Sequence, residues 1–203
     1  PMRYFFNKNT PESKVNLHMV ESDHEFLSLN LSFIQYLKSH DESRIAYAQL
    51  KQDLLKKPEA MLRTNMRFSG YTLGKYQFIN TILDKAGFNG IRLMHCMHPV
   101  EWSAAKYFRD TYFFGPHGIE DPYTWTFHHE EHAHLVLYQG TQIIAYAHIQ
   151  FWPDQRAAIR IIAVDENKRN QRFGSKFLAL IEKWLRSLGV KSIHAESRQS
   201  SLR

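Results

Sequence analysis

The sequence has a single cysteine, Cys96, among 203 residues, so no disulfide can form within the chain. One thiol fits a reducing compartment, and we expect the cytoplasm, with Cys96 as a small apolar core residue. No run approaches the ~20 apolar residues of a membrane-spanning helix, and no charged-plus-apolar leader is present. Because the first residue is Pro1 rather than Met, we expect a processed, trimmed or fragmentary chain.

Acidic residues are in the minority, with 20 Asp and Glu against 26 Lys and Arg, which gives a net charge of +6. The basic residues are spread along the chain, a distribution that serves small anionic ligands as readily as nucleic acid. The sequence has no zinc-finger spacing, RNA-binding signature or basic arm, which argues against a nucleic-acid partner. The hydrophobic fraction of 43% is enough for a core, and the length predicts one or two domains.

The most informative stretch runs from Ala157 to Gly189. A short, β-branched apolar run at 159–164 predicts a strand. A charged turn follows at 165–172, and 173–188 has the apolar spacing of a helix that Gly189 would end. The N–H groups at such a helix start, together with the helix dipole, favour a phosphate ligand.

This turn resembles the acyl-CoA-binding motif of the GNAT superfamily of N-acetyltransferases, Arg/Gln-x-x-Gly-x-Gly/Ala. Here it reads Arg169-Asn170-Gln171-Arg172-Phe173-Gly174, so the first and last positions match and Arg172 replaces the middle glycine. Arginine keeps the backbone N–H and adds a charge that favours phosphate, but it forbids the closest backbone approach. The alternative is an ordinary strand–turn–helix unit with a basic surface turn.

The resemblance implies a site for acetyl-CoA as co-substrate. The backbone of 162–164 would pair with the pantetheine arm, and the amides of 170–175 would hold the pyrophosphate. The implied cofactor-binding residues are Ile162, Ala163, Val164, Arg169, Asn170, Gln171, Arg172, Phe173, Gly174 and Ser175.

Asn89-Gly90 is a turn signal, and we place the domain boundary there, between 1–88 and 89–203. Beyond it, the predicted order β-α-β-β-β-α-β fits the GNAT core, a mixed, mostly antiparallel sheet with flanking helices. By the resemblance, the loop from Phe113 to Tyr123 shapes the acceptor pocket. Four aromatic residues could form an apolar pocket wall or belong to the core: Trp125, Phe127, Tyr146 and Trp152.

Acetyl transfer needs a base that takes a proton from the acceptor ammonium, and N–H groups that polarise the thioester carbonyl. We expect Glu196 to be the base, because it ends the strand beside the CoA-binding strand. His194 and Glu130 are alternatives, as is a purely structural Glu196. The superfamily's catalytic tyrosine would lie beyond residue 203. The exposed edge of the last strand could pair with a second copy in a homodimer.

The segment His128-His129-Glu130-Glu131-His132-Ala133-His134 contains zinc-ligand residue types and would place two histidines on one face of a strand. Its order is not HExxH and no cysteine is nearby. We therefore predict no metal, and expect the end of a helix that leads into an edge strand.

Residues 1–86 resemble the C-terminal half of GrpB-like proteins, relatives of the nucleotidyltransferase fold. The match is carried by Asn16-Leu17-His18, 33–37, Tyr47-Ala48-x-Leu50-Lys51 and Lys75-Tyr76-x-Phe78-Ile79. The residues that serve nucleotide chemistry in that family lie upstream of this stretch, so that activity does not carry over. Lys51 and Lys75 could contact an anionic ligand or lie on solvated helix faces.

The patterns predict an N-terminal β-hairpin followed by helices over 24–40, 41–55 and 71–86. The whole chain is then an α+β protein with a GNAT-like domain that is incomplete at its C-terminus. We expect an N-acetyltransferase that moves an acetyl group from acetyl-CoA to the amine of a small molecule or peptide. The alternatives are a non-catalytic CoA-binding or interaction module, and a remnant nucleotidyltransferase-fold protein.

Overall fold

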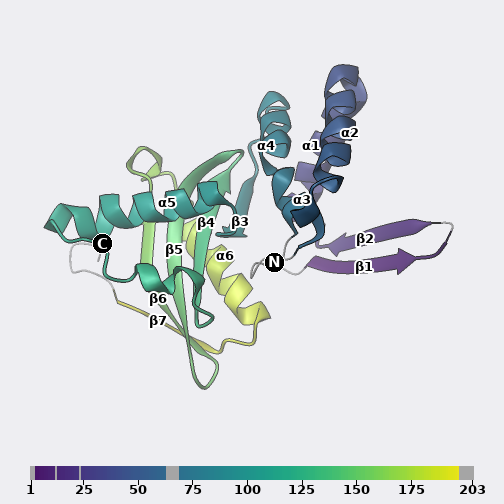
Figure 1. Cartoon of the computed structure of the whole chain (residues 1–203). Helices are drawn as coiled ribbons and strands as arrows, with labels where there is room; N and C mark the ends of the chain where they lie inside the picture. The colour runs from purple at the N-terminus through teal and green to yellow at the C-terminus, as the bar shows by residue number, and fades with distance from the viewer. Residues whose placement is uncertain (1–2, 12, 23, 63–68, 197–203) are drawn as a thin grey trace. The chain divides into compact units, whose positions relative to one another are not determined.

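The computed structural model describes residues 3–11, 13–22, 24–62 and 69–196 (Figure 1). The chain divides into two compact units. One unit contains 1–21, 92–138 and 142–203, and the other contains 22–91 and 139–141. The helices and strands of both units confirm the predicted α+β class.

The first unit is built on a sheet of five strands in the order β3-β4-β5-β6-β7. The strands are β3 (Ile91–His95), β4 (His132–Gln139), β5 (Gln142–Trp152), β6 (Arg156–Val164) and β7 (Ser192–Ala195). β5 and β6 pair antiparallel and β6 and β7 pair parallel, while a short turn joins β4 to β5. The mixed, mostly antiparallel sheet is confirmed, but β4 is an inner strand and not the edge strand that we expected.

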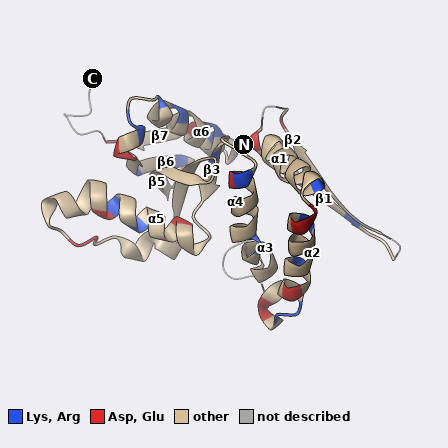
Figure 2. Cartoon of the chain, turned by 90° about the horizontal axis from the view of Figure 1, so that it is seen from above, with Lys and Arg blue, Asp and Glu red and all other residues tan. Residues whose placement is uncertain are grey.

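Helices α5 (Pro99–Arg109) and α6 (Phe173–Ser187) lie on opposite faces of this sheet (Figure 2). Side chains of β5 alternate between them: Tyr146 contacts Phe108 of α5, whereas Phe151 contacts Trp184 of α6. The apolar face of α6 is fully buried, and each such side chain contributes about 1.5–3 kcal/mol. Its buried residues are Phe177, Ile181 and Leu185.

Four short helical turns connect these elements. They are η2 (Asp110–Phe114, a π-helical turn), η3 (Gly115–His117), η4 (Thr124–His128) and η5 (Glu166–Lys168). The loop that we expected over Phe113–Tyr123 contains the end of η2 and all of η3. The helix end that we predicted before β4 is η4.

The second unit is helical, with α1 (Glu25–Ser39), α2 (Asp41–Leu55), η1 (Pro58–Met61), α3 (Gly70–Gly74) and α4 (Tyr76–Lys85). Its core joins α1 and α4 through Phe33, Leu37, Ile82 and Leu83. The single helix that we expected over 71–86 breaks at Lys75. Gly74, a poor helix former, lies so close to α2 that an added Cβ would collide with the Leu54 side chain.

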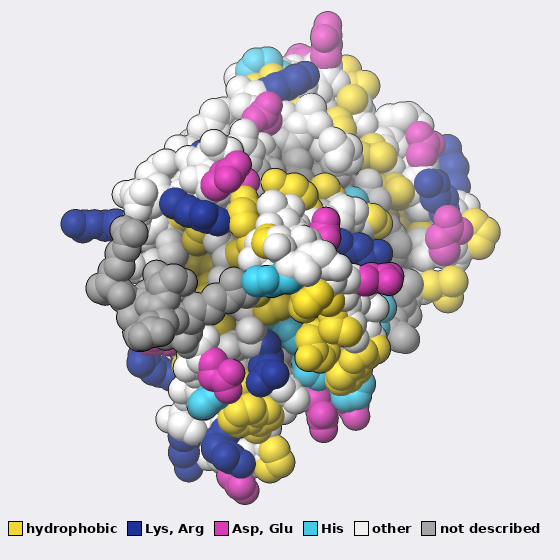
Figure 3. Space-filling model, turned by 90° about the vertical axis from the view of Figure 1, so that its left-hand side faces the viewer, with side chains coloured by type: hydrophobic (Ala, Val, Ile, Leu, Met, Phe, Trp, Pro, Cys, Tyr) yellow, Lys and Arg dark blue, Asp and Glu magenta, His cyan; other side chains and the backbone are white. Residues whose placement is uncertain are grey.

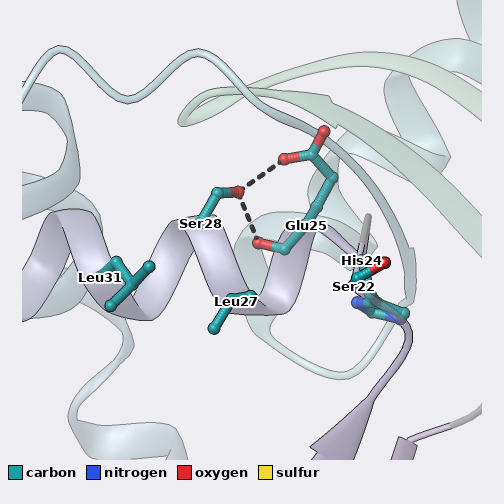
Figure 4. Close-up of a pocket in the computed structure, with 6 residues that line it drawn as sticks. All are labelled: Ser22, His24, Glu25, Leu27, Ser28 and Leu31. Carbon is teal, nitrogen blue, oxygen red and sulfur yellow. Dashed lines mark hydrogen bonds between the residues drawn. The ribbon is translucent and has the colours of Figure 1, made fainter.

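A shallow cleft opens at the start of α1, lined by Ser22, His24, Glu25, Leu27, Ser28 and Leu31 (Figure 4). The Ser28 hydroxyl donates to the Glu25 carbonyl at 3.1 Å or to its carboxylate at 2.9 Å. None of the residues predicted to bind a cofactor lines this cleft.

The predicted N-terminal hairpin is confirmed, with β1 (Arg3–Asn9) and β2 (Lys14–Val20) paired antiparallel. Tyr4 is opposite Met19 and Phe6 is opposite Leu17 in the register. Among the described residues, no helix combines the length and apolar character needed to cross a membrane.

Candidate functional site

The predicted phosphate-binding turn connects β6 to α6. The Asp165 carboxylate accepts a hydrogen bond from the Asn167 N–H at 2.9 Å, and the Gln171 amide donates to the Asn167 carbonyl at 3.1 Å. Asn170 and Arg172 have positive φ angles of 60° and 62°. These bonds and angles curl the turn tightly before the helix begins.

The start of α6 offers unpaired donors. Lys176 donates the helix's first backbone hydrogen bond, to the Arg172 carbonyl at 3.0 Å, so the N–H groups of 173–175 have no acceptor within the helix. Arg172, the N-cap residue, makes no side-chain cap bond. Amides without acceptors at the positive end of a helix dipole form a site suited to an anion.

Gly174 has room around it on the helix surface. An added Cβ would meet only Val164 Cγ2, at 3.7 Å, which is an ordinary van der Waals contact. The backbone therefore does not need glycine here for internal packing. Because glycine has no side chain, the free space beside the backbone at Gly174 allows a ligand to approach it closely.

Arg172 occupies the position of the missing motif glycine, in the left-handed conformation. A non-glycine residue there costs about 1–2 kcal/mol. We expect Arg172→Gly to raise the free energy of urea-induced unfolding by about 1 kcal/mol. The control is Arg186→Gly, the same exchange within α6, which should lower it by about as much. A loss of stability in both variants would contradict the argument.

Arg169 is held in place at the turn. Its Nε donates to the Val164 carbonyl at 3.2 Å, and its guanidinium lies 5.0 Å from the centre of the Tyr112 ring. The Tyr112 hydroxyl also accepts the Glu166 N–H at 3.2 Å. Tyr112, from η2, thus braces the turn, and nothing in the sequence pattern singled it out.

The sheet separates beside this turn. Over the described residues, β7 pairs only with Arg156–Ile159 of β6. The β5–β6 register shifts between Ile159 and Ile161, so Arg160 is the extra residue of a β-bulge at the point where pairing with β7 ends. A bulge bends and twists its strand. Within the described ranges, the edge of 162–164 has no strand partner on that side, next to the start of α6.

Glu196 directly follows the last paired residue of β7, Ala195, which is opposite Ile159. Its carboxylate is 3.3 Å from His194 Nε2, and its side chain is 82% exposed. The His194 ring in turn lies 5.4 Å from that of Trp152. The structure therefore brings two of the three candidate bases together, whereas Glu130 lies exposed in the turn before β4.

A buried polar network fills the other face of β4 and β5. Arg109, which is fully buried, donates to both carboxylate oxygens of Asp121 at 2.6 and 2.8 Å. It also donates to the Tyr146 hydroxyl at 3.3 Å and to His148 Nδ1 at 3.2 Å. Burial would raise the pKa of Asp121, but the Arg109 hydrogen bonds lower it overall. This ion pair anchors the 110–128 segment to the sheet.

Arg109 also fixes the tautomers of two histidines. Because a guanidinium can only donate, His148 Nδ1 accepts and its proton lies on Nε2. That Nε2–H donates to His132 Nδ1 at 2.9 Å, so the proton of neutral His132 lies on Nε2. Burial lowers the pKa of His148 to about 2 and also lowers the pKa of His132, which keeps both rings neutral.

His134 completes the network and has the same tautomer as His148. Its Nε2–H donates to the Thr126 carbonyl at 3.1 Å, so its Nδ1 accepts the Tyr146 hydroxyl at 2.7 Å. Burial lowers the pKa of His134 to about 3. His132 and His134 do share one strand face, but hydrogen bonds occupy both ring nitrogens of His134 and the Nδ1 of His132. Within the described ranges, no group of three metal-ligand side chains is arranged to hold an ion.

The exposed side of this region is aromatic. Trp125 is 60% exposed, and its ring makes edge contacts with the rings of His129 and His132 at 5.5 and 5.3 Å. Figure 3 shows hydrophobic and histidine side chains adjoining one another on one face of the molecule. Phe127 and Tyr146 are buried. Of the four candidate wall residues, Trp125 and Trp152 are the accessible ones.

Comparison with protein families identifies the two parts of the chain. Residues 98–203 match the model of the Acetyltransferase (GNAT) family, and residues 1–85 match that of the GrpB protein family. Because the first match covers 106 of the 203 residues, the chain belongs to the GNAT acetyltransferase family. Both resemblances and the prediction of an N-acetyltransferase are confirmed, whereas the 88/89 boundary stays a prediction.

A search of curated proteins finds no match. Similar solved structures include the ribosomal-protein-S18-alanine N-acetyltransferase from Escherichia coli (20% identity, TM-score 0.46, covering 56% of this chain and 70% of that one). The aminoglycoside acetyltransferase meta-AAC0020, from an uncultured soil metagenomic sample, shares 13% identity (TM-score 0.48, 57% and 82% covered). AAC(6')-Iy, solved with the bisubstrate analogue CoA-S-monomethyl-acetylneamine, shares 10% (TM-score 0.45, 55% and 82%).

Proposed function

We propose that the chain transfers an acetyl group from acetyl-CoA to an amine of a small molecule or peptide. The observation that carries the proposal is the start of α6, where amides without an acceptor in the helix and the open backbone at Gly174 lie beside the part of β6 that no strand covers over the described residues. Phosphate binding at helix starts and strand-like pairing at free edges are the two contacts that a CoA thioester needs.

In this proposal the amides of 170–175 bind the pyrophosphate, and Arg169 and Arg172 add positive charge. Arg169 is already oriented by Val164 and Tyr112, so little side-chain freedom is lost on binding. The edge of 162–164 hydrogen-bonds the pantetheine arm and directs the thioester toward the bulge at Arg160.

The reaction is a direct displacement. The acceptor nitrogen forms a bond to the acetyl carbon, the carbon–sulfur bond breaks, and CoA leaves as the thiolate. Glu196 takes the proton from the acceptor ammonium, and backbone N–H groups near Val164 polarise the carbonyl. The position of Glu196, where β7 ends its pairing with β6, supports this assignment.

The acceptor is proposed to bind on the α5 face of the sheet. Trp125 supplies an exposed apolar surface there, and the neutral His132 offers its Nε2–H as a hydrogen-bond donor. The buried Arg109–Asp121 pair holds the segment that carries Trp125. We also propose a cytoplasmic location, since a single cysteine, which cannot form a disulfide within the chain, fits a reducing compartment, and a homodimer that pairs through the β7 edge.

Two measurements test the proposal. Calorimetry with acetyl-CoA on the whole chain should give saturable binding, and an assay of thiol release with a panel of amines should identify an acceptor. The absence of acetyl-CoA binding would refute the proposed function. If acetyl-CoA binds but no amine gives thiol release, the protein is a CoA-binding module and not an enzyme.

Glu196→Gln removes the proposed base without changing the shape of the side chain. We expect kcat to fall by about 100-fold or more near neutral pH, because a positioned general base contributes that much, while the affinity for acetyl-CoA stays unchanged. The control is Glu42→Gln, an exposed carboxylate on α2. Full activity of Glu196→Gln at every pH would remove Glu196 from the mechanism.

A further inference from the structure

Two lysines of the helical unit are each stacked on a tyrosine. Lys51 Nζ lies 4.8 Å from the centre of the Tyr47 ring, and Lys75 Nζ lies 4.3 Å from that of Tyr71. In both pairs the lysine follows its tyrosine by four residues, which places the two side chains on the same side of the local helix. Both ammonium groups are partly buried.

The two pairs come from segments that approach one another closely, since an added Cβ at Gly74, next to Lys75, would collide with the side chain of Leu54, three residues after Lys51. Burial lowers the pKa of Lys75, and the charge of Lys51 lowers it further. Likewise, burial raises the pKa of Tyr47, and Tyr71 raises it further. One pair comes from α2 and the other from α3 and the break before α4, so both pairs lie where these segments approach one another.

In the described part of the chain, no carboxylate forms an ion pair with either lysine. The sequence has no Asp or Glu between Ala60 and Leu83. Asp53, two residues after Lys51, accepts hydrogen bonds from Gln49 and Lys56.

Without a bound ligand, the cluster lowers the stability of the folded protein. Two like charges that repel one another in a partly desolvated place destabilise the fold. The tyrosine rings offset part of this cost, because a cation is attracted to the face of an aromatic ring. A bound anion would neutralise both charges, and a dianion would match them in number.

We propose that Tyr47, Lys51, Tyr71 and Lys75 form a site for a phosphate group, free or carried by a larger molecule. Two ammonium groups and two hydroxyls provide several donors, which suits the oxygens of a phosphate better than the two of a carboxylate. The Tyr47 ring is itself held by stacking on Phe78, at 5.2 Å between ring centres. The site is independent of the α6 turn and of acetyl transfer.

Calorimetry on the whole chain at low salt tests the proposal with inorganic phosphate, tripolyphosphate and ATP. We expect Lys75→Met and Lys51→Met each to weaken binding about tenfold, as expected for losing one charge-assisted contact. Lys75→Arg should keep most of the affinity because it keeps the charge. Lys38→Met, at an exposed position of α1, is the matched control and should bind normally.

Thermal unfolding gives a second readout that a structural role would not produce. Without ligand, Lys75→Met should melt at a higher temperature than the parent, because a repulsion is gone. Added tripolyphosphate should raise the melting temperature of the parent and Lys38→Met, but not that of Lys75→Met. Binding of ATP alone would identify a nucleotide, and binding of all three a phosphate group as such.

Two outcomes would overturn the proposal. One is the absence of binding for all three ligands at millimolar concentration. The other is equal affinity for the parent, Lys51→Met and Lys75→Met, which would assign the phosphate to another place, such as the α6 turn. Acetyl-CoA binding should be the same in all of these variants, which separates this site from the acetyl-transfer site.

Discussion

Gly174→Val should lower the affinity for acetyl-CoA by more than about tenfold while the protein remains folded. We expect this loss of affinity because the added side chain would clash with the bound ligand and not with the protein. A side chain at Gly174 would occupy the space in which a phosphate approaches the helix amides. On the protein side it meets only Val164 Cγ2, at 3.7 Å.

Gly174→Ala separates stability from binding more cleanly. Alanine in the first turn of α6 should raise the free energy of unfolding by up to about 0.5–1 kcal/mol, because glycine loses more backbone entropy on folding. Its single methyl group should still weaken acetyl-CoA binding, though less than valine does. If Gly174→Ala is more stable than the parent but binds acetyl-CoA more weakly, misfolding does not explain the loss of affinity.

The matched control is Ala179→Val, which adds the same side chain at an exposed position of α6 away from the turn. It should bind acetyl-CoA like the parent and lose only the small helix propensity of a β-branched residue. Unchanged affinity in Gly174→Val would show that CoA does not bind at the start of α6.

The strand, turn and helix around this glycine could be predicted because their signals are local. A β-branched run, a charged turn and a 3.6-residue period lie within 157–189, and Gly189 ends α6 with a φ of 86° as its position indicated. The motif spacing then pointed to the residues of the turn.

Contacts between distant segments could not be read in the same way. Arg109 and Asp121 are twelve residues apart in the sequence. Arg109 also donates to Tyr146 and His148 of β5, which are 37 and 39 residues away. In the sequence, Arg109 is only a charge at the end of a helix pattern. Its complete burial depends on partners that the fold brings together.

Two backbone features were also beyond local patterns. The bulge at Arg160 depends on the register between β5 and β6. Both strands determine that register, so the sequence of β6 alone does not predict the bulge. The break between α3 and α4 follows from the close approach of Leu54 to Gly74. In both cases a neighbouring element overrides the preference of the segment itself.

The fold should lose stability steeply in mild acid. His134 and His148 are 3% and 4% exposed, and burial lowers their pKa values to about 3 and about 2, below the ordinary 6.5. Between these values and 6.5 the unfolded chain binds protons that the folded chain does not. The free energy of unfolding therefore falls as the pH falls below about 6.5.

The expected slope is about 1.4 kcal/mol per pH unit for each buried histidine. Two histidines over about two pH units amount to roughly 5 kcal/mol, which is comparable to the whole stability of many domains. The charges that face these rings reinforce the effect, since Arg109 from α5 disfavours protonation of both and Arg160 from β6 disfavours that of His148. Above about pH 5 ordinary carboxylates stay ionised, so the slope in that range reports histidines.

His134→Asn and His148→Asn test this assignment with a side chain that can still accept the bond made at Nδ1, from Tyr146 or Arg109 respectively. The free energy of unfolding is measured with urea between about pH 6.5 and 5. Each variant should reduce its slope against pH by about 1.4 kcal/mol per pH unit, the contribution of one histidine. The exposed His117→Asn should leave it unchanged. A parent protein equally stable across that range would mean that the two rings titrate alike in the folded and unfolded chain, and that the network around Arg109 does not exclude protons.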